Sequence, residues 1–222
     1  MMTDAPFATE AEAMRHAMVV SQLRPNAVND PRVVAAMARV PREDFLPVPL
    51  RTLAYRDRPL PLGDGRYANL PEATGRLLTE AKIQPGDDAL LIGAGGGYTA
   101  ALLAALAGKV VAVESDPALL AIARPALADF ANVALVEGAL TAGAPDHAPY
   151  TLIVIDGAVE QVPPALIDQL VPGGRLVTGI VDRGVTRLAL GIRTAGGFGL
   201  TDFADVACAV LPGFARPREF AF

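Results

Sequence analysis

The chain has 222 residues, 52% of them hydrophobic, and this length favours one domain with an added segment over two full domains. Its formal net charge of -5 and sequence pI of about 5.0 argue against a nucleic-acid partner, because no basic footprint can form. The single cysteine, Cys208, excludes an internal disulfide and fits a reducing compartment. Its neighbours in "VACAV" predict a buried apolar position rather than a nucleophile.

The N-terminus does not resemble a signal peptide. The stretch "MMTDAPFATEAEAM" carries acidic residues where a signal would carry basic ones, and it lacks an apolar region. The only uncharged stretch long enough to cross a bilayer, 89–108, has "GAGGGYT" at its centre. Consecutive glycines there each cost about 1 kcal/mol relative to alanine in a helix. We therefore expect a cytoplasmic protein with no membrane span and no membrane partner.

Helix signals dominate the first part of the chain. The stretch "TEAEAMRHAMVVSQLR" begins with a capping box of Thr9 and Glu12 and continues with apolar residues at helical spacing. The stretch "NDPRVVAAMARV" predicts a second helix, with Asp30 as its N-cap and a proline at its first position. Residues 41–69 are expected to be irregular, and a third helix is expected over 71–81.

After the turn "QPGDD", short apolar runs alternate with helical segments. The runs are "ALLIG", "VVAVE", "VALVE", "TLIVID" and "GGRLVTGIV". The expected helices cover 98–107, 117–129, with a kink at Pro125, and 163–170. Runs too apolar to face water on one side, alternating with helices, predict a parallel sheet covered by helices. From Val185 onward, strands joined by a glycine turn predict an antiparallel edge.

These elements together predict an α/β fold. We expect a doubly wound, mostly parallel, Rossmann-like sheet with helices on both faces, an N-terminal helical appendage and an antiparallel C-terminal edge. The expected division is 1–82 for the appendage and 83–222 for the nucleotide-binding type of core, joined in one compact unit.

Glycines follow the first predicted strand and precede the first helix of the core. Such residues let a backbone approach a ligand at the carboxyl end of a strand, although a tight turn that holds nothing is the alternative. The G-x-G-x-G spacing places Tyr98 where a dinucleotide fingerprint has its third glycine, which favours S-adenosylmethionine methyltransferases over dehydrogenases. Glu114 ends the next strand and could accept hydrogen bonds from both ribose hydroxyls; an ordinary solvated strand end is the alternative.

Three longer stretches carry a more specific resemblance. They are "MVVSQLRPNAVNDPRVVAAMARVPREDFLP", "AYRDRPLPLGDGRYANLPEATGRL" and "IGAGGGYTAALLA", and "VPREDF" and "AYRDRPLPLG" are the most diagnostic parts. In order and spacing the chain resembles protein-L-isoaspartate O-methyltransferases from about Met18 to Arg175. The resemblance implies a methyltransferase sheet with N-terminal helices over the site. It also implies S-adenosylmethionine as cofactor, S-adenosylhomocysteine as product, and methylation of isoaspartyl carboxylates in a protein or peptide, the first step of their repair.

The residue types present suit that reaction. A carboxylate is already ionised at pH 7 and the leaving group is a neutral thioether, so the transfer requires alignment and exclusion of water rather than a general base. The only two histidines, His16 and His147, are expected at the surface and have no partner at metal-ligand spacing, so no metal is expected. The only serines, Ser21 and Ser115, lie in no nucleophile elbow, which disfavours a serine hydrolase.

The resemblance also implies where ligands bind. It places the acceptor at Asn69 and Pro71 as catalytic positions, with Arg66 and Asp156 on the substrate. It places the cofactor against eight residues: Gly93, Ala94, Gly95, Gly97, Tyr98, Glu114, Gly138 and Ala139.

The chain departs from the family pattern at four places. The family's T-I-S-Q-P segment, whose serine lies at the acceptor site, reads Tyr67-Ala68-Asn69-Leu70-Pro71, and the acid that usually precedes the glycine loop is Leu91. The family's G-D-G, whose aspartate contacts the adenine amine, reads Gly138-Ala139-Leu140, and the threonine after the fourth strand is Asp156. Losing two polar cofactor contacts predicts binding weaker by about 1–3 kcal/mol.

The changes near the acceptor have opposite expected effects. Asn69 can still donate to a carboxylate through its amide. Asp156 would repel an anionic acceptor unless a cation intervenes, and Arg66, which replaces a family glutamine, is a possible partner for it.

Three functions remain open on these grounds. The first is an isoaspartyl-type carboxyl methyltransferase that uses S-adenosylmethionine. The second is a degenerate family member that binds a nucleoside cofactor or a partner without methyl transfer. The third is a methyltransferase or oxidoreductase with an unrelated substrate.

Overall fold

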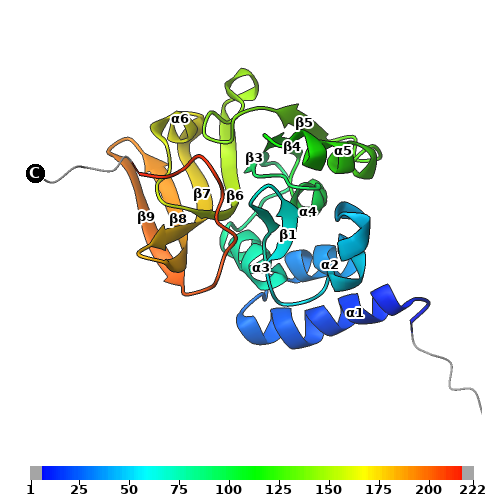
Figure 1. Ribbon diagram of the computed structural model, residues 1–222. Coiled ribbons are helices and arrows are strands. Elements are labelled where there is room, and N and C mark those ends of the chain that lie inside the picture. Colours follow the sequence, from blue (N-terminus) through cyan, green and yellow to red (C-terminus); the bar gives the residue numbers. More distant parts are fainter. Residues whose placement is uncertain (1–6, 217–222) are drawn as a thin grey trace, which may run out of the picture.

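In a computed structural model that describes residues 7–216, seven strands form one sheet in the order β5-β4-β3-β6-β7-β8-β9 (Figure 1). The five strands from β5 to β7 run parallel, and β8 and β9 continue the sheet as an antiparallel edge. The strands are β3 (Asp88–Ile92), β4 (Lys109–Glu114), β5 (Val133–Glu137), β6 (Tyr150–Val159), β7 (Leu170–Asp182), β8 (Val185–Thr194) and β9 (Gly197–Ala204). This topology confirms the expected fold class.

The helices divide into an N-terminal group and a group between the strands. The α-helices are α1 (Glu10–Met18), α2 (Pro31–Arg39), α3 (Pro71–Glu80), α4 (Tyr98–Ala104), α5 (Pro117–Ala126) and α6 (Pro164–Ile167). A π-helical turn, η1 (Val19–Leu23), extends α1, and the short 3-10 turns are η2 (Arg24–Asn26), η3 (Arg42–Phe45), η4 (Val48–Leu53) and η5 (Pro145–His147).

The predicted caps of the first two helices are present. The Thr9 hydroxyl accepts a hydrogen bond from the Glu12 N–H at 3.1 Å, and the Glu12 carboxylate accepts one from the Ala8 N–H at 2.9 Å. The Asp30 carboxylate accepts from two N–H groups in the first turn of α2, at 2.8 and 3.4 Å. Local side-chain chemistry therefore sets both helix starts.

Several expected boundaries were wrong. Residues 41–69 are not merely irregular, since they hold two 3-10 turns and an antiparallel hairpin of β1 (Leu60–Gly63) and β2 (Arg66–Ala68). The helix expected over 117–129 ends at Ala126, and Pro125, which has no N–H to donate, lies in its last turn. The helix expected over 163–170 is a single turn, and β7 already begins at Leu170.

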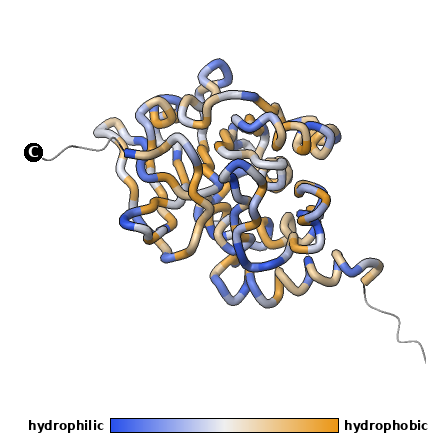
Figure 2. The backbone as a smooth tube through the Cα atoms, in the orientation of Figure 1, coloured by the Kyte–Doolittle hydropathy of each residue, from blue (hydrophilic) through white to orange (hydrophobic). Residues whose placement is uncertain are grey.

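Side chains of the central strands are buried on both faces of the sheet. In β3, Leu91 packs with the N-terminal helices and α4, whereas Leu90 and Ile92 pack with Leu166 of α6 and with Leu211 near the C-terminus. The second face is thus covered by α6 and loops more than by long helices. Figure 2 shows hydrophilic stretches at outer turns and along α1, outside this core. Burial on both faces explains why these strands lack alternation.

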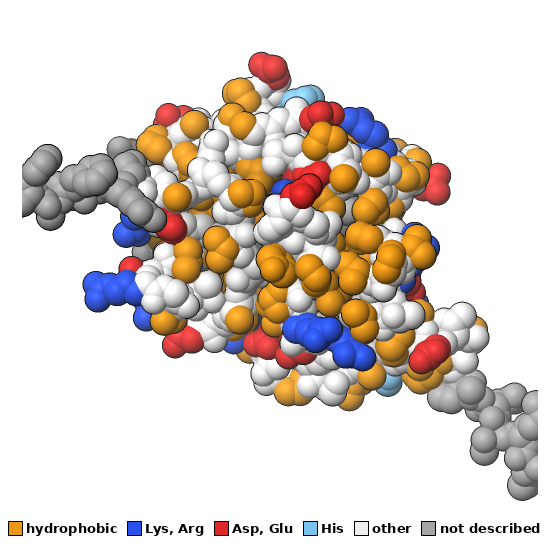
Figure 3. All heavy atoms as spheres, viewed as in Figure 1, with side chains coloured by type: hydrophobic (Ala, Val, Ile, Leu, Met, Phe, Trp, Pro, Cys, Tyr) orange, Lys and Arg blue, Asp and Glu red, His pale blue; other side chains and the backbone are white. Residues whose placement is uncertain are grey.

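Charged side chains are dispersed over the face seen in Figure 3, where neither sign gathers into a continuous patch. Among residues 7–216, no helix is both long and apolar enough to cross a bilayer. The stretch 89–108 instead forms most of β3, the glycine turn, α4 and the residues that lead into β4. The stretch 1–14, which is not expected to be a signal peptide, lies partly outside the described residues.

Candidate active site

The turn between β3 and α4 has a backbone that glycine alone adopts easily. Gly93, Gly95 and Gly97 have φ angles of 79°, 56° and 105°, in the left-handed region. A Cβ on Gly96 would lie 2.0 Å from the Phe45 carbonyl oxygen, so η3 packs its backbone directly onto the turn. The N-terminal block "VPREDF" and the glycine loop therefore form one structure, although they lie about fifty residues apart in the sequence.

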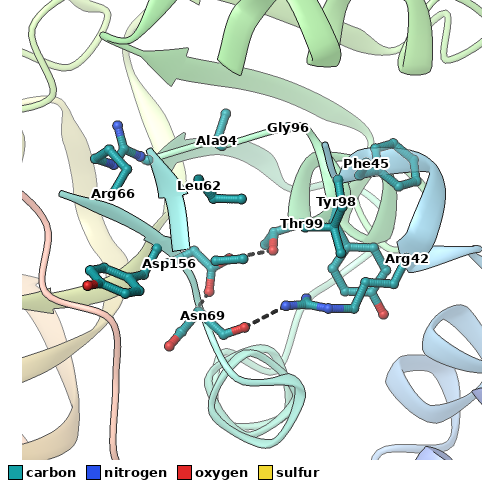
Figure 4. A pocket seen from close by; sticks show the side chains of 15 residues that line it. Arg42, Phe45, Leu62, Arg66, Asn69, Ala94, Gly96, Tyr98, Thr99 and Asp156 are labelled. Atoms are coloured by element: carbon teal, nitrogen blue, oxygen red, sulfur yellow. Dashed lines mark hydrogen bonds between the residues drawn. The ribbon is translucent and has the colours of Figure 1, made fainter. Parts of the chain in front are cut away.

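A cavity lies over this turn at the carboxyl end of β3, bounded by η3, the β1–β2 hairpin and the end of β6 (Figure 4). Its free volume is about 30 Å³, which is space for one or a few water molecules. Its lining includes residues from all four segments: Arg42, Phe45, Leu46, Leu62, Arg66, Tyr67, Ala68, Asn69, Gly93, Ala94, Gly95, Gly96, Tyr98, Thr99 and Asp156. Open α/β sheets bind ligands at this edge.

Asp156 is held by three neutral donors, which come from the segment before α3, from α3 and from α4. Its Oδ1 accepts from the Asn69 amide at 3.0 Å and from the Thr74 hydroxyl at 2.8 Å. Its Oδ2 accepts from the Thr99 hydroxyl at 2.5 Å. The pairing of β6 with β7 shifts register between Val154 and Ala158, and Asp156 lies within this irregular part of β6. Both oxygens of Asp156 are therefore already bound within the chain.

Arg42 is the cation nearest to this network. Its side chain is buried and donates to the backbone carbonyls of Ala54, at 2.9 Å, and Asn69, at 2.7 Å. The guanidinium lies 4.9 Å from the centre of the Tyr98 ring. Burial lowers the pKa of Arg42, and Tyr98 and Asp156 oppose that shift. Burial also raises the pKa of Tyr98 to about 12, so its ring stays neutral beneath the cation.

Glu114 ends β4 inside the protein and is fully buried, which excludes the interpretation that it is a solvated strand end. Arg66 donates to both of its carboxylate oxygens, with Nη2 at 2.9 Å from Oε2. The Gly95 N–H donates to Oε2 at 2.7 Å. The hypothesis that Arg66 neutralises Asp156 is wrong, because its guanidinium pairs with Glu114 instead.

The C-terminal segment packs against residues of the site. The Ala209 N–H donates to the Asn69 Oδ1 at 3.1 Å, and residues 209 and 211 exchange backbone hydrogen bonds with Ala158 of β6. A Cβ on Gly93 would lie 2.9 Å from the Leu211 side chain. Cys208 in this segment is buried as predicted, although it follows β9 rather than lying within an edge strand.

The predicted site residues divide into two groups. Those that line the cavity are Arg66, Asn69, Gly93, Ala94, Gly95, Tyr98 and Asp156. Glu114 lies behind Arg66, Gly97 precedes α4, and Pro71 begins α3. Gly138 and Ala139 follow β5 and do not line the cavity; the Gly138 N–H donates to the Glu114 carbonyl at 3.0 Å.

Three site residues were missed by the sequence reasoning. Arg42, Thr74 and Thr99 hold Asn69 and Asp156 in place, yet none was proposed. Arg42 lies within "VPREDF", one of the two most diagnostic stretches, and Thr99 is the second residue after the glycine loop. Their positions in the sequence were therefore a usable signal. Nothing local to Thr74 marks it, because its partner lies 82 residues away.

Comparison with known proteins decides the family. A family model described as protein-L-isoaspartate(D-aspartate) O-methyltransferase matches residues 14–202. A protein-L-isoaspartate O-methyltransferase from Methanoculleus marisnigri is 43% identical over 171 residues, which cover 76% of this chain and 78% of that one. The chain belongs to the protein-L-isoaspartate O-methyltransferase family. The expected family is thereby confirmed, and with it the expected methyltransferase class and S-adenosylmethionine as its cofactor.

Solved structures agree on the fold. A protein-L-isoaspartate O-methyltransferase has a TM-score of 0.75 at 23% identity, and the match covers 91% of this chain and 66% of that one. A Plasmodium falciparum structure, described as a beta-aspartate methyltransferase in complex with S-adenosyl-L-homocysteine, has a TM-score of 0.74 at 16% identity. That match covers 91% of this chain and 98% of the other. At these identities the likeness supports the fold alone.

The residues present fit the cofactor of this family. Gly95 leaves the backbone of the glycine turn open to close approach, because nothing but Leu62 lies within 4 Å of a Cβ built on it. Glu114 supplies an ionisable acceptor at the end of the neighbouring strand. Gly95 and Glu114 thus suit a nucleoside with free ribose hydroxyls once the hydrogen bonds from Arg66 to Glu114 are released.

Proposed function

We propose that this chain methylates the free carboxylate of isoaspartyl residues in proteins or peptides, using S-adenosylmethionine. The observation that carries the proposal is the family match over residues 14–202, since it spans both the N-terminal block and the glycine loop that together form the cavity. When bound, the cofactor supplies a methyl group on a positively charged sulfur, and its transfer to a carboxylate oxygen leaves a neutral thioether.

The residues of the cavity divide this work between them. Gly93, Gly95 and Tyr98 would lie against the cofactor, and Glu114 would accept hydrogen bonds from its ribose. These residues hold a ligand at the carboxyl edge of β3, where the backbone of the turn is exposed to the cavity. The chain contributes position rather than acid–base chemistry at this edge, because the nucleophile is already charged.

The acceptor side would be formed by Asn69 and the groups that hold it. Asn69 is fixed through its backbone carbonyl by Arg42 and through its amide by Asp156, so its orientation is set from two directions. Asn69 lines the cavity between β2 and α3, the helix that begins at Pro71; Figure 4 shows its side chain beside Asp156. The short C-terminal segment at Ala209 limits water on that side.

A second function is supported by one observation. Asp156, which lines the cavity, and Glu114, which lies behind Arg66, already have their oxygens bound by donors of the chain. A protein in which the Asp156 contacts persist after Arg66 leaves Glu114 would bind a nucleoside or a partner without transferring a methyl group. Methyl transfer therefore requires that ligand binding opens these contacts.

Methyl transfer from labelled S-adenosylmethionine to an isoaspartyl peptide tests the first function, with the matching aspartyl peptide as the control acceptor. Labelling of the isoaspartyl peptide alone supports it. Calorimetric titration with S-adenosylhomocysteine separates the alternatives. Binding without transfer to either peptide favours the second function, and absence of both binding and transfer contradicts the first.

The remaining expectations about the protein's surroundings stay predictions. They are a protein or peptide substrate, no nucleic-acid partner and a cytoplasmic location. Chromatography of the purified chain with an isoaspartyl protein and with duplex DNA would test the first two.

A further inference from the structure

We propose that Arg66 occupies the ribose position of Glu114 and that the carboxylate of an incoming nucleoside ligand releases it. The inference rests on the proposed function, because it takes Glu114 as the ribose acceptor. Arg66 would then determine which nucleosides bind: ligands that bring their own carboxylate, as S-adenosylmethionine does, over those that do not.

The hydrogen-bonding capacity of Glu114 is fully used. Five donors reach its two oxygens, whereas a carboxylate offers about four lone-pair positions. Besides the two terminal nitrogens of Arg66, three backbone N–H groups donate: those of Gly95 at 2.7 Å, Ser115 at 2.8 Å and Asp116 at 3.0 Å. Ribose hydroxyls therefore have no acceptor position left while Arg66 stays in place.

Arg66 itself is incompletely satisfied where it lies. Its side chain is buried, and its Nε has no hydrogen-bond partner. An unpaired buried donor costs free energy, and this reduces what is lost when the guanidinium moves. Arg66 thus makes a strong ion pair but keeps one donor, its Nε, that a second partner could use.

Among the described residues, no carboxylate that lines the cavity is free to serve as that second partner. Among the described lining residues, the only carboxylate is Asp156, and both of its oxygens accept from Asn69, Thr74 and Thr99. A buried guanidinium without an anion is costly, so a displaced Arg66 needs a negative group from outside the chain. The ligand's own carboxylate supplies one.

The element that carries Arg66 is separate from the main sheet. Arg66 begins β2, which pairs only with β1 in a two-stranded hairpin among the described strands. Gly63, Asp64 and Gly65 at its turn all have positive φ angles, and the register shifts between Pro61 and Gly63. Leu62 of the same hairpin approaches Gly95. Movement of this hairpin would release Glu114 and uncover the glycine turn while the central strands stay paired.

The test compares two ligands that differ in the amino-acid part. S-adenosylhomocysteine carries a carboxylate, whereas 5′-methylthioadenosine has the same nucleoside and sulfur without it. Both are titrated by calorimetry into the wild type, Arg66→Gln, Arg66→Lys and the control Arg58→Gln, which changes an exposed arginine outside the cavity. Thermal unfolding of each variant checks folding. Glu114 keeps three backbone donors in Arg66→Gln, so this variant is expected to fold.

The wild type is expected to bind S-adenosylhomocysteine more tightly than 5′-methylthioadenosine. In Arg66→Gln, the affinity for 5′-methylthioadenosine should rise about tenfold or more, and the preference for the carboxylate ligand should fall by a similar factor, as expected when a charged hydrogen bond is removed. Arg66→Lys should lie between, and Arg58→Gln should match the wild type.

Three results would overturn the proposal in different ways. If both ligands bind the wild type and their affinity ratio is unchanged in Arg66→Gln, Arg66 does not compete for Glu114, and the proposed function still stands. If neither ligand binds the wild type or a folded Arg66→Gln, the cavity is not a nucleoside site, and the proposed function fails as well. If both ligands bind only Arg66→Gln, Arg66 blocks Glu114 but the ligand's carboxylate does not release it, and the proposal is overturned.

Discussion

The Asn69 side chain donates to the Asp156 carboxylate across 3.0 Å and so joins the segment before α3 to the end of β6. The two residues lie 87 positions apart, and both differ from the family pattern. The hydrogen bond thus joins the two positions at which asparagine stands for the family's serine and aspartate for its threonine. The longer amide reaches the new carboxylate, which explains why Asp156 is tolerated without a direct cation.

Asp156→Thr should reduce the stability of the fold and strengthen binding of the anionic acceptor. Threonine has a single oxygen, so some of the three donors now held by Asp156 would lose their partner, at a cost of about 1–3 kcal/mol. Removing the negative charge should lower KM for an isoaspartyl peptide. Urea unfolding and steady-state methylation measure the two effects. Asp156→Asn is the matched control for charge, and an unchanged KM in both variants would refute the electrostatic part.

Restoring the family residues at positions 69, 70 and 139 should raise methyl transfer, whereas restoring the acid at position 91 should destabilise the fold. Asn69→Ser with Leu70→Gln and Ala139→Asp should increase transfer to an isoaspartyl peptide by about 100-fold if Asn69 misplaces the acceptor by about 1 Å. Adding Leu91→Glu should lower the melting temperature, because Leu91 is fully buried among apolar side chains and a carboxylate there lacks a partner. Equal transfer by the wild type and the triple variant would show that these changes do not limit activity.

The two halves of the Arg66–Glu114 pair should differ in their effect on stability. Glu114→Gln leaves a buried guanidinium without an anion and should cost about 3–5 kcal/mol of unfolding free energy. Arg66→Gln should cost less, about 1–3 kcal/mol, because Glu114 keeps three backbone N–H donors. Denaturant unfolding of both singles and the double variant measures the costs. A larger loss in Arg66→Gln than in Glu114→Gln would contradict this order.

The ion pair of Asp87 with Arg175 should make stability depend on acid pH. Burial of Asp87 opposes its ionisation, but hydrogen bonds from Arg175, Gln84 and Thr151 outweigh it and hold the pKa below 3.8. A lowered carboxyl pKa stabilises the fold above about pH 4 and ceases to do so as pH falls through the folded-state value.

The difference in unfolding free energy between wild type and Asp87→Asn should therefore be about 1–3 kcal/mol at pH 7 and shrink below about pH 4. Urea unfolding at several pH values tests this. A difference that stays constant down to pH 3 would rule out a contribution from the charge of Asp87.

The Cys208 thiol should react only after unfolding. Burial and, to a smaller extent, the charge of Asp156 raise its pKa to about 12. At pH 8 only about one thiol in 10⁴ would then be ionised, and the side chain is enclosed as well. Labelling with a thiol reagent should be slow in buffer and complete in denaturant. Rapid stoichiometric labelling of the native protein would show that the C-terminal segment is open.

The sequence by itself determined the elements whose cause is local. Thr9 and Asp30 mark helix starts because a cap is a contact between residues two or three positions apart. The apolar runs identified the central strands because burial on both faces excludes polar residues. The glycine spacing located the turn after β3, since the backbone there requires positive φ angles.

Only the tertiary structure decided how the charged side chains pair. Arg66 lies 48 residues from Glu114, and Thr99 lies 57 residues from Asp156. Nothing in either neighbourhood specifies which carboxylate each donor meets, and Asp156 was as plausible a partner for Arg66 as Glu114. The choice is made by the hairpin that carries Arg66 over the glycine turn, because a buried charge is stable only where folding brings an opposite charge and donors to it.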